Sequence, residues 1–243
     1  MTRSYFLSFL LCSSVMSFIG CDSLPGKPTL EDRWVASNEI MDFKTLYGQN
    51  CAACHGQDGL HGAALSLNDP LFLAIVNKEV LTDTISKGVS GTSMPAFSLS
   101  SGGTLTNKQI ESLVNGMMSN WGQPGQFNGV TLPPYSIQTA TADGSGPGDV
   151  ARGAAAFNTF CAQCHGNDGK GGKAGSVVNA DYLGLVSDQG LRTIVIVGRP
   201  DLGKPDWRKN ISGQPMTAQE ISDVVAWLAS HRSTAAGRQG GNP

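Results

Sequence analysis

Apolar residues recur at helical spacing in two stretches that match when the chain is moved along itself by 111 positions. The spacing i, i+3, i+4, i+7 puts them on one face of a helix, which predicts a buried stripe in each stretch. The residues concerned are Ile110, Leu113, Val114 and Met117, and then Ile221, Val224, Val225 and Leu228. A capping box precedes each stretch, Thr106-x-x-Gln109 and Thr217-x-x-Glu220. We therefore predict a final helix in each half of the chain.

Earlier elements repeat in the same way. The first helix of each half is marked by Phe43 and Tyr47, and by Gly153 and Phe157. A short helix follows around residues 81–87, and its counterpart lies around residues 191–197. Each half is therefore expected to be a small, mostly helical unit.

The repeat sets the predicted domain organisation. A shift of the chain along itself by 110 positions aligns six residues of the first half with identical residues of the second. It places Cys51, Cys54, His55, Gly56, Asp58 and Gly59 on Cys161, Cys164, His165, Gly166, Asp168 and Gly169. Between the two copies lies a Gly- and Pro-rich stretch with almost no charge, which is typical of a linker. The predicted segments are a first domain over residues 39–121, a linker over 122–148, a second domain over 149–233 and a disordered tail over 234–243.

The N-terminus predicts export. Arg3 precedes an apolar run over residues 5–19, and residues 1–20 are interpreted as a signal peptide. Gly20-Cys21 resembles a bacterial lipobox, so Cys21 is the predicted site of lipidation and residues 21–38 the lipid-anchored tether. Phe18 departs from the usual Leu of that motif, which leaves a plain signal peptide or an uncleaved anchor as alternatives. In each case the domains face an oxidising compartment, on the periplasmic side of a bacterial membrane.

Composition and charge narrow the class of protein. The chain has 243 residues, of which 31 are Gly and 12 are Pro, and only 7% are aromatic. A domain of fewer than ninety residues with so few large side chains buries only a thin core on its own. A net charge of −2 argues against general affinity for nucleic acid.

Two five-residue blocks supply the candidate chemistry, Cys51-Ala52-Ala53-Cys54-His55 and Cys161-Ala162-Gln163-Cys164-His165. C-x-x-C-H is the attachment signature of a c-type haem, because two thiols one turn apart form the thioethers and the adjacent imidazole reaches the iron. A thioredoxin-like pair or half a zinc ribbon are the alternatives for C-x-x-C alone. The remaining cysteines, Cys12 and Cys21, lie in and at the end of the signal, so the motifs use all the others.

With these motifs the chain resembles class I cytochrome c, present twice over residues 39–233. The resemblance implies an all-α fold of two tandem cytochrome c domains with two covalently bound haem c groups. It implies that His55 and His165 are axial iron ligands and that each haem carries one electron. The loop Gly91-Thr92-Ser93-Met94-Pro95 matches the ligand loop of the family, which makes Met94 the opposite ligand of the first haem. Met117 and Met118, in the final helix, are the competitors for that role.

The second half departs from this pattern. Met94 follows His55 by 39 residues, and the residue 39 positions after His165 is Lys204. Met216 is the Met that remains in this half, and it precedes its capping box as Leu105 precedes the first one. Three alternatives stay open for the sixth position of the second haem: Met216 from a longer loop, the neutral amine of Lys204, or an open site.

The predicted function is electron transfer. We expect a dihaem cytochrome c that moves electrons between a membrane donor complex and a terminal acceptor, such as a haem-copper oxidase or a reaction centre, and that has no catalytic residues of its own. One alternative is a haem enzyme at a weakly ligated second haem, reducing peroxide or oxidising a small sulfur anion. Others are the cytochrome subunit of a periplasmic dehydrogenase, and a gas sensor.

Charge is divided unevenly between the predicted domains. Residues 39–121 hold seven acidic and four basic side chains, whereas residues 149–233 hold eight acidic and nine basic ones. The basic residues near the second motif are Lys170, Lys173, Arg199, Lys204, Arg208 and Lys209. Such a rim is expected either to steer an acidic redox partner or to be a solvated surface.

Overall fold

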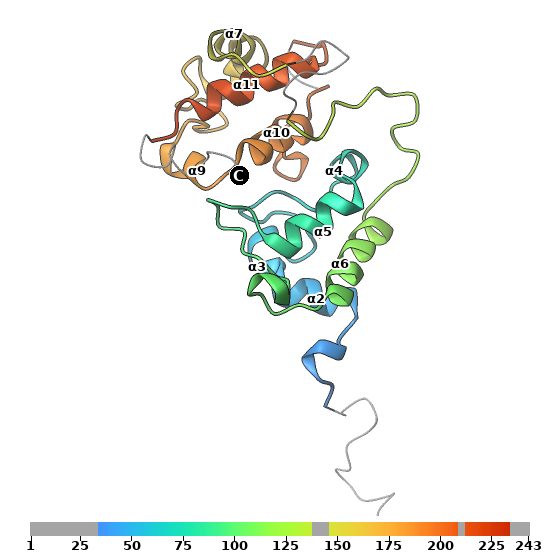
Figure 1. The fold of residues 1–243 in the computed structure, drawn as a ribbon. Helices are drawn as coiled ribbons and strands as arrows, with labels where there is room; N and C mark the ends of the chain where they lie inside the picture. The colour runs from blue at the N-terminus through green and yellow to red at the C-terminus, as the bar shows by residue number, and fades with distance from the viewer. Residues whose placement is uncertain (1–33, 138–145, 209–211, 234–243) are drawn as a thin grey trace, which may run out of the picture. The chain divides into compact units, whose positions relative to one another are not determined.

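The computed structural model describes residues 34–137, 146–208 and 212–233 (Figure 1). The chain divides into two compact units, Met1–Glu39 and Ile40–Pro243, and each is described by itself. The described part of the first unit holds one short 3₁₀ helix, η2 (Ser37–Glu39). The predicted signal peptide, the lipidation site Cys21 and the C-terminal tail lie outside the described residues.

The second unit is helical, and its elements occur twice in the same order. The first series is α2 (Phe43–Asn50), α3 (Ala52–His55), α4 (Pro70–Ile75), α5 (Lys78–Lys87), η3 (Leu99–Ser101) and α6 (Asn107–Asn120). The second series is α7 (Val150–Phe160), α8 (Ala162–His165), α9 (Ala180–Gly184), α10 (Asp188–Val197), η4 (Pro200–Leu202) and α11 (Ala218–Ala229). Within the described ranges β-type pairing is limited to two isolated bridges, Ser98 with Leu105 and Arg199 with Lys204. The all-α prediction with two tandem domains is therefore confirmed.

The predicted starts of the last helix in each half agree with the structure. Thr106 and Thr217 are the N-caps of α6 and α11, and both capping boxes are formed. The short helices predicted around residues 81–87 and 191–197 are α5 and α10, and each begins one turn earlier than predicted.

Helix α4 was not predicted, although its start carries a sequence signal. Asp69 accepts hydrogen bonds from the N–H groups of Leu71 and Phe72, and Pro70 occupies the first helical turn. Asp before Pro at a helix start is a common combination, because Pro has no N–H to leave unsatisfied there.

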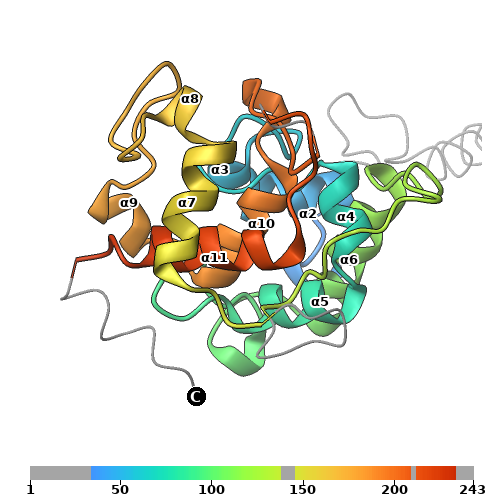
Figure 2. The same cartoon turned by 90° about the horizontal axis from the view of Figure 1, so that it is seen from above.

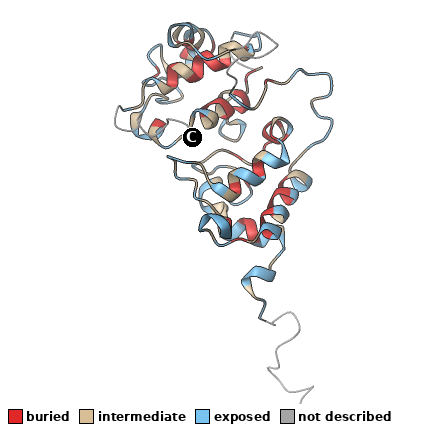
Figure 3. Ribbon diagram, viewed as in Figure 1, coloured by how far each residue is buried: buried red, intermediate tan, exposed pale blue. Residues whose placement is uncertain are grey.

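In each half the last helix packs on the first, and the buried stripes line that contact. Ile110 in α6 and Ile221 in α11 are almost fully buried, as the apolar spacing predicts. Figure 2 shows α7 crossing α11, the most extensive helix contact of the second half. Buried positions concentrate on the inward faces of α6, α10 and α11 (Figure 3).

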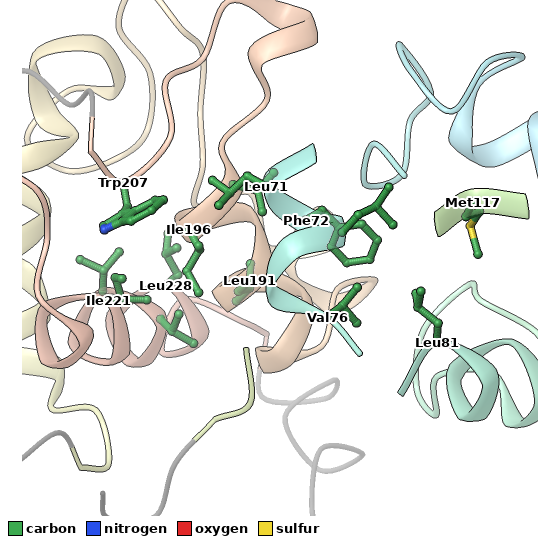
Figure 4. Packing of buried hydrophobic residues seen from close by; sticks show 14 of the residues in the cluster. Leu71, Phe72, Val76, Leu81, Met117, Leu191, Ile196, Trp207, Ile221 and Leu228 are labelled. Atoms are coloured by element: carbon green, nitrogen blue, oxygen red, sulfur yellow. The ribbon is translucent and has the colours of Figure 1, made fainter. Parts of the chain in front are cut away.

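The two halves of the second unit share a core. Helix α4 of the first half contacts α10 of the second, and Leu71 lies beside Ile196 and Leu191 (Figure 4). The stretch before α7 is attached to the same helix α10, because the buried Arg192 side chain donates to the carbonyl of Pro134. This part of the predicted linker is therefore packed against the second half.

No helix among the described residues combines the length and the apolar character that crossing a bilayer requires.

Candidate functional site

Each C-x-x-C-H motif lies at a break between two helices. Cys51 ends α2, its N–H bonded to the carbonyl of Tyr47, and Cys161 ends α7 in the same way against Phe157. The rest of each motif forms the single turn of α3 or α8. None of the four motif cysteines forms a disulfide. The local fold thus brings two thiols and one imidazole together on consecutive turns in each half.

The motif histidines are held in the same orientation. His55 Nδ1 lies 2.7 Å from the carbonyl oxygen of Leu65, and His165 Nδ1 lies 2.9 Å from that of Gly175. A carbonyl only accepts, so Nδ1 carries the proton in both rings and Nε2 keeps its lone pair. Metal-binding histidines are commonly oriented by such a second hydrogen bond. The residues present therefore fit the axial ligation expected for a haem.

Burial favours the uncharged form of the first cysteine in each motif and of His55. It raises the pKa of the Cys51 and Cys161 thiols to about 11 in each case, with a smaller effect from the second cysteine of each motif. Burial also lowers the pKa of His55, a shift that the hydrogen bond to Leu65 partly opposes. A neutral imidazole and an apolar surround suit a porphyrin.

Two glycines let the following loop close over the motif. A Cβ built on Gly62 would lie 2.3 Å from the carbonyl oxygen of Cys54, and one on Gly172 would lie 2.5 Å from that of Cys164. Because these contacts are to backbone, neither position has room for a side chain. Both halves thus hold their motif in the same backbone cradle, 110 positions apart.

The loops that carry Met94 and Lys204 have the same backbone hydrogen bond. The carbonyl of Met94 accepts from Val89 N–H at 3.0 Å, and the carbonyl of Lys204 accepts from Arg199 N–H at 3.2 Å. Both residues are half-buried, and both are followed by Pro. Lys204 therefore occupies in the second half the position that Met94 occupies in the first.

Met216 occupies a different place. Its side chain is buried, and its N–H donates to the carbonyl of Trp207 at 3.1 Å. Leu105 is equally buried in the first half, where its N–H donates to the carbonyl of Phe97 at 2.7 Å. Met216 thus stands where the other half has a core leucine. Met117 is also a core residue, on the buried face of α6.

The two histidines outside the motifs, His61 and His231, contact other parts of the protein. The His61 N–H donates to Asp201, whereas its own side chain is exposed. His231 donates from Nδ1 to the carbonyl of Trp227 and packs edge-on against the indole, with ring centroids 4.5 Å apart.

The basic rim predicted around the second motif is partly neutralised. Arg199 pairs with Asp201 and Arg208 with Asp206, at 2.9 Å and 2.7 Å. The carboxylate partners were not singled out from the sequence, although each stands two residues after or before its arginine. Lys170 and Lys173 remain exposed, and Lys209 lies outside the described residues.

Two family models match the chain, one in each half. Residues 38–115 match the family described as "Cytochrome C oxidase, cbb3-type, subunit III", and residues 150–232 match the family described as "Cytochrome c". Both matches contain one C-x-x-C-H motif with its following loop.

Curated relatives match one or both halves. A cytochrome bc1 complex cytochrome c subunit of Corynebacterium diphtheriae is 32% identical over 38% of this chain and 31% of its own length. The corresponding subunit of Corynebacterium efficiens is 25% identical over 80% of this chain and 64% of its own length. The cbb3-type cytochrome c oxidase subunit FixP of Sinorhizobium medicae is 27% identical over 76% of this chain and 61% of its own length. The chain therefore spans less than two thirds of the length of these relatives.

Proposed function

The chain belongs to the c-type cytochrome family, and we propose that it carries single electrons as a dihaem component of a respiratory complex. Each half has one cytochrome c domain, so the chain holds two covalently bound haem c groups. The observation that carries the proposal is the matched orientation of His55 and His165, each fixed through Nδ1 by a carbonyl ten residues later. Haem iron, when bound, alternates between its ferrous and ferric states and so stores one electron.

The residues that hold each haem follow from the two motifs. The thioethers form at Cys51 and Cys54 in the first domain, and at Cys161 and Cys164 in the second. His55 and His165 would bind iron through Nε2, because the hydrogen bonds to the carbonyls leave that atom unprotonated.

Met94 would hold the first haem together with His55. It lies in a half-buried loop closed by the Val89 to Met94 backbone hydrogen bond, whereas the competing Met117 is committed to the core of α6. A thioether ligand stabilises ferrous iron, so His/Met ligation raises the reduction potential.

Lys204 would hold the second haem together with His165. Its loop repeats the backbone hydrogen bond of the Met94 loop, and Met216 is buried where the first domain has Leu105. A lysine amine coordinates after losing its proton, and proximity to a metal ion favours that loss. Because an amine does not favour ferrous iron as a thioether does, a second haem held by Lys204 would have the lower reduction potential. This difference would favour electron transfer from the second site to the first.

The partners are membrane complexes of the respiratory chain. The relatives are cytochrome subunits of a bc1 complex and of a cbb3-type oxidase, which supports a donor of the first kind and an acceptor of the second. The predicted lipid on Cys21 would hold the chain at the periplasmic side of the membrane. A tethered carrier and a fixed subunit are both consistent with this placement.

Electron transfer of this kind is outer-sphere, so the chain acts as a carrier rather than as an enzyme. The absence of Met at position 204 favours one rival, a haem enzyme whose second iron binds a small substrate. That rival requires a ligand that is displaced easily. The Lys204 loop is closed by two backbone hydrogen bonds to Arg199, which argues for a fixed ligand.

The optical spectrum of the fully reduced holoprotein, with and without carbon monoxide, tests the proposal together with a redox titration. Two low-spin haems that do not respond to carbon monoxide, and that titrate in two one-electron steps, are expected for a carrier. A carbon monoxide shift in half of the haem would overturn Lys204 ligation and favour the enzyme. A chain with one haem, or with none, would overturn the proposal altogether.

A further inference from the structure

A short hairpin in the second domain reaches the haem-binding loop of the first. It runs over residues 199–204 and is closed at its base by two hydrogen bonds between Arg199 and Lys204, with N···O distances of 3.2 Å and 2.9 Å. The turn of η4 lies at its tip. The hairpin therefore carries, on one short piece of chain, both the proposed ligand Lys204 and side chains that contact the other domain.

Asp201 makes the first contact between the domains. Its Oδ2 accepts from the backbone N–H of His61 at 3.0 Å, 140 positions earlier in the chain. The side chain of Asp201 is 1% exposed, so this hydrogen bond to a carboxylate is shielded from water. His61 has a φ of +62°, a backbone conformation that is uncommon for residues other than glycine. Asp201 therefore accepts a hydrogen bond from a turn whose backbone conformation is unfavourable for a residue with a side chain.

Arg199 makes the second contact. Its Nη2 donates to the carbonyl of Gly62 at 3.0 Å and to Asp201 Oδ2 at 2.9 Å, while its Nε donates to Asp201 Oδ1 at 3.0 Å. The arginine and the aspartate therefore form a bidentate pair that binds the backbone of two consecutive residues of the other domain. We name this set of four residues, Arg199, Asp201, His61 and Gly62, the clamp.

The clamp touches the backbone of both haem sites. Gly62 lies so close to the first motif that a Cβ on it would be 2.3 Å from the Cys54 carbonyl oxygen and 2.4 Å from the His55 carbonyl carbon. At the other end, Arg199 is hydrogen-bonded through its backbone to Lys204. A continuous chain of covalent and hydrogen bonds therefore runs from the proposed ligand of one iron to the motif that binds the other.

We propose that the clamp is the junction that fixes the two haem sites relative to each other and across which electrons pass between them. In this step one electron leaves the reduced iron of the second site and reduces the oxidised iron of the first, and no bond or proton is moved. Arg199 and Asp201 act as positioning residues. The inference rests on the proposed function, since it assigns the internal route of the same electron transfer.

The test uses the full-length holoprotein and three variants. D201N removes the negative charge of Asp201, and R199K keeps the positive charge at position 199 but loses the bidentate geometry. D83N is the matched control, because Asp83 pairs with Lys87 on the surface of α5 with both side chains 67% exposed. The readouts are amide hydrogen exchange at His61, the rate of electron exchange between the haems after photochemical reduction, and the two reduction potentials.

In D201N we expect amide exchange at His61 to be at least ~10-fold faster, since a hydrogen bond to a charged group is worth more than a factor of ten in an equilibrium constant. Exchange should also be faster in R199K, because Lys cannot hold the Asp201 carboxylate through two N–H groups. The rate between the haems should fall by a comparable factor, while D83N behaves as the unaltered protein and both haems keep their spectra. Faster exchange at His61 with an unchanged rate would overturn the junction and leave the carrier function intact. Unchanged exchange at His61 would show that no clamp exists. If the unaltered protein moves no electron between its haems, the proposed direction of transfer fails as well.

Discussion

Gly116 in α6 lies directly against the ring of Phe43 in α2: a Cβ built on the glycine would be 2.2 Å from Phe43 Cδ2. The second half has the opposite arrangement at the same crossing. Gly153 stands at the register position of Phe43, and Trp227 stands at that of Gly116. A Cβ on Gly153 would meet the Cβ of Trp227 at 2.7 Å. Each crossing therefore pairs one glycine with one aromatic residue, with the two exchanged between the helices.

Gly116→Ala is expected to destabilise the first domain. The added methyl overlaps the Phe43 ring, and overpacking of a core contact costs about 1–3 kcal/mol. The free energy of unfolding of the holoprotein, measured with denaturant, checks this. Gly48→Ala is the control, because Gly48 lies in α2 and a methyl added there would meet no atom within 4 Å. There the same exchange should stabilise the helix by about 0.5–1 kcal/mol.

A double-mutant cycle with Phe43→Ala identifies the cause. If the ring is what the new methyl strikes, Gly116→Ala should cost far less once the ring is absent. An equal cost in both backgrounds would mean that the methyl disturbs α6 itself rather than the crossing.

The repeat in the sequence predicted the helices well, but it did not predict how the crossings are filled. Trp121 and Trp227 are not aligned by the repeat, yet their Cη2 atoms reach equivalent loop glycines: a Cβ on Gly59 or Gly169 would lie 3.1 Å or 3.0 Å from them. The two indoles arrive from different turns of the last helix. An alignment of the two halves compares positions along the backbone and does not show how far a large ring extends. The equivalent contacts of the two indoles could therefore be found only from the fold.

The candidate site was predictable as far as its local motifs go. Spacing identified His55 and His165, because attachment chemistry requires cysteines and histidine close together in the chain. The carbonyls that orient them, from Leu65 and Gly175, belong to loops without a motif. The pairing of Asp201 with His61 joins positions 140 apart, and no periodic signal marks it. Which residue ligates the second iron stays a prediction.

Lys204→Met is expected to raise the reduction potential of the second haem. A thioether in place of an amine favours ferrous iron, and the rise should be roughly 0.1 V or more, since axial ligands set haem potentials over about 0.8 V. Redox titration with optical detection measures it. Met216→Leu is the control and should change neither the potential nor the spectrum, because the first domain has Leu105 in that place. A changed second haem in Met216→Leu would assign the ligand to Met216 instead.

Met94→Lys makes the reciprocal change in the first domain. It should lower the potential of the first haem toward that of the second, because the Met94 and Lys204 loops share the same backbone hydrogen bond. Electron exchange between the haems would then lose its preferred direction, which titration of both haems and flash photolysis detect. An unchanged first haem would mean that a residue other than Met94 coordinates its iron.

Asp223→Asn is expected to destabilise the second domain. The Asp223 side chain is 3% exposed and accepts hydrogen bonds at 2.8 Å from Asp149 N–H, from Gln219 Nε2 and from both Nε and Nη2 of Arg152. These contacts join the start of α7 to α11. Losing one hydrogen bond to a charged group costs about 1.5–3 kcal/mol. Ser112→Ala, which removes the hydrogen bond to the Met41 carbonyl at the equivalent place in the first domain, should leave the second domain unchanged.

The same carboxylate gives a pH dependence of defined sign. Burial alone would raise the pKa of Asp223, but the hydrogen bonds from Arg152, Asp149 and Gln219 lower it by more. A pKa below its unfolded value of about 3.9 means that Asp223 stabilises the fold above that pH and loses this contribution as the pH falls toward its folded pKa. The difference in unfolding free energy between the unaltered protein and Asp223→Asn should therefore be constant from pH 7 to pH 5 and shrink below about pH 4. A difference that grew on acidification would show that the folded carboxyl is protonated more readily than the unfolded one, and that the pair with Arg152 does not form.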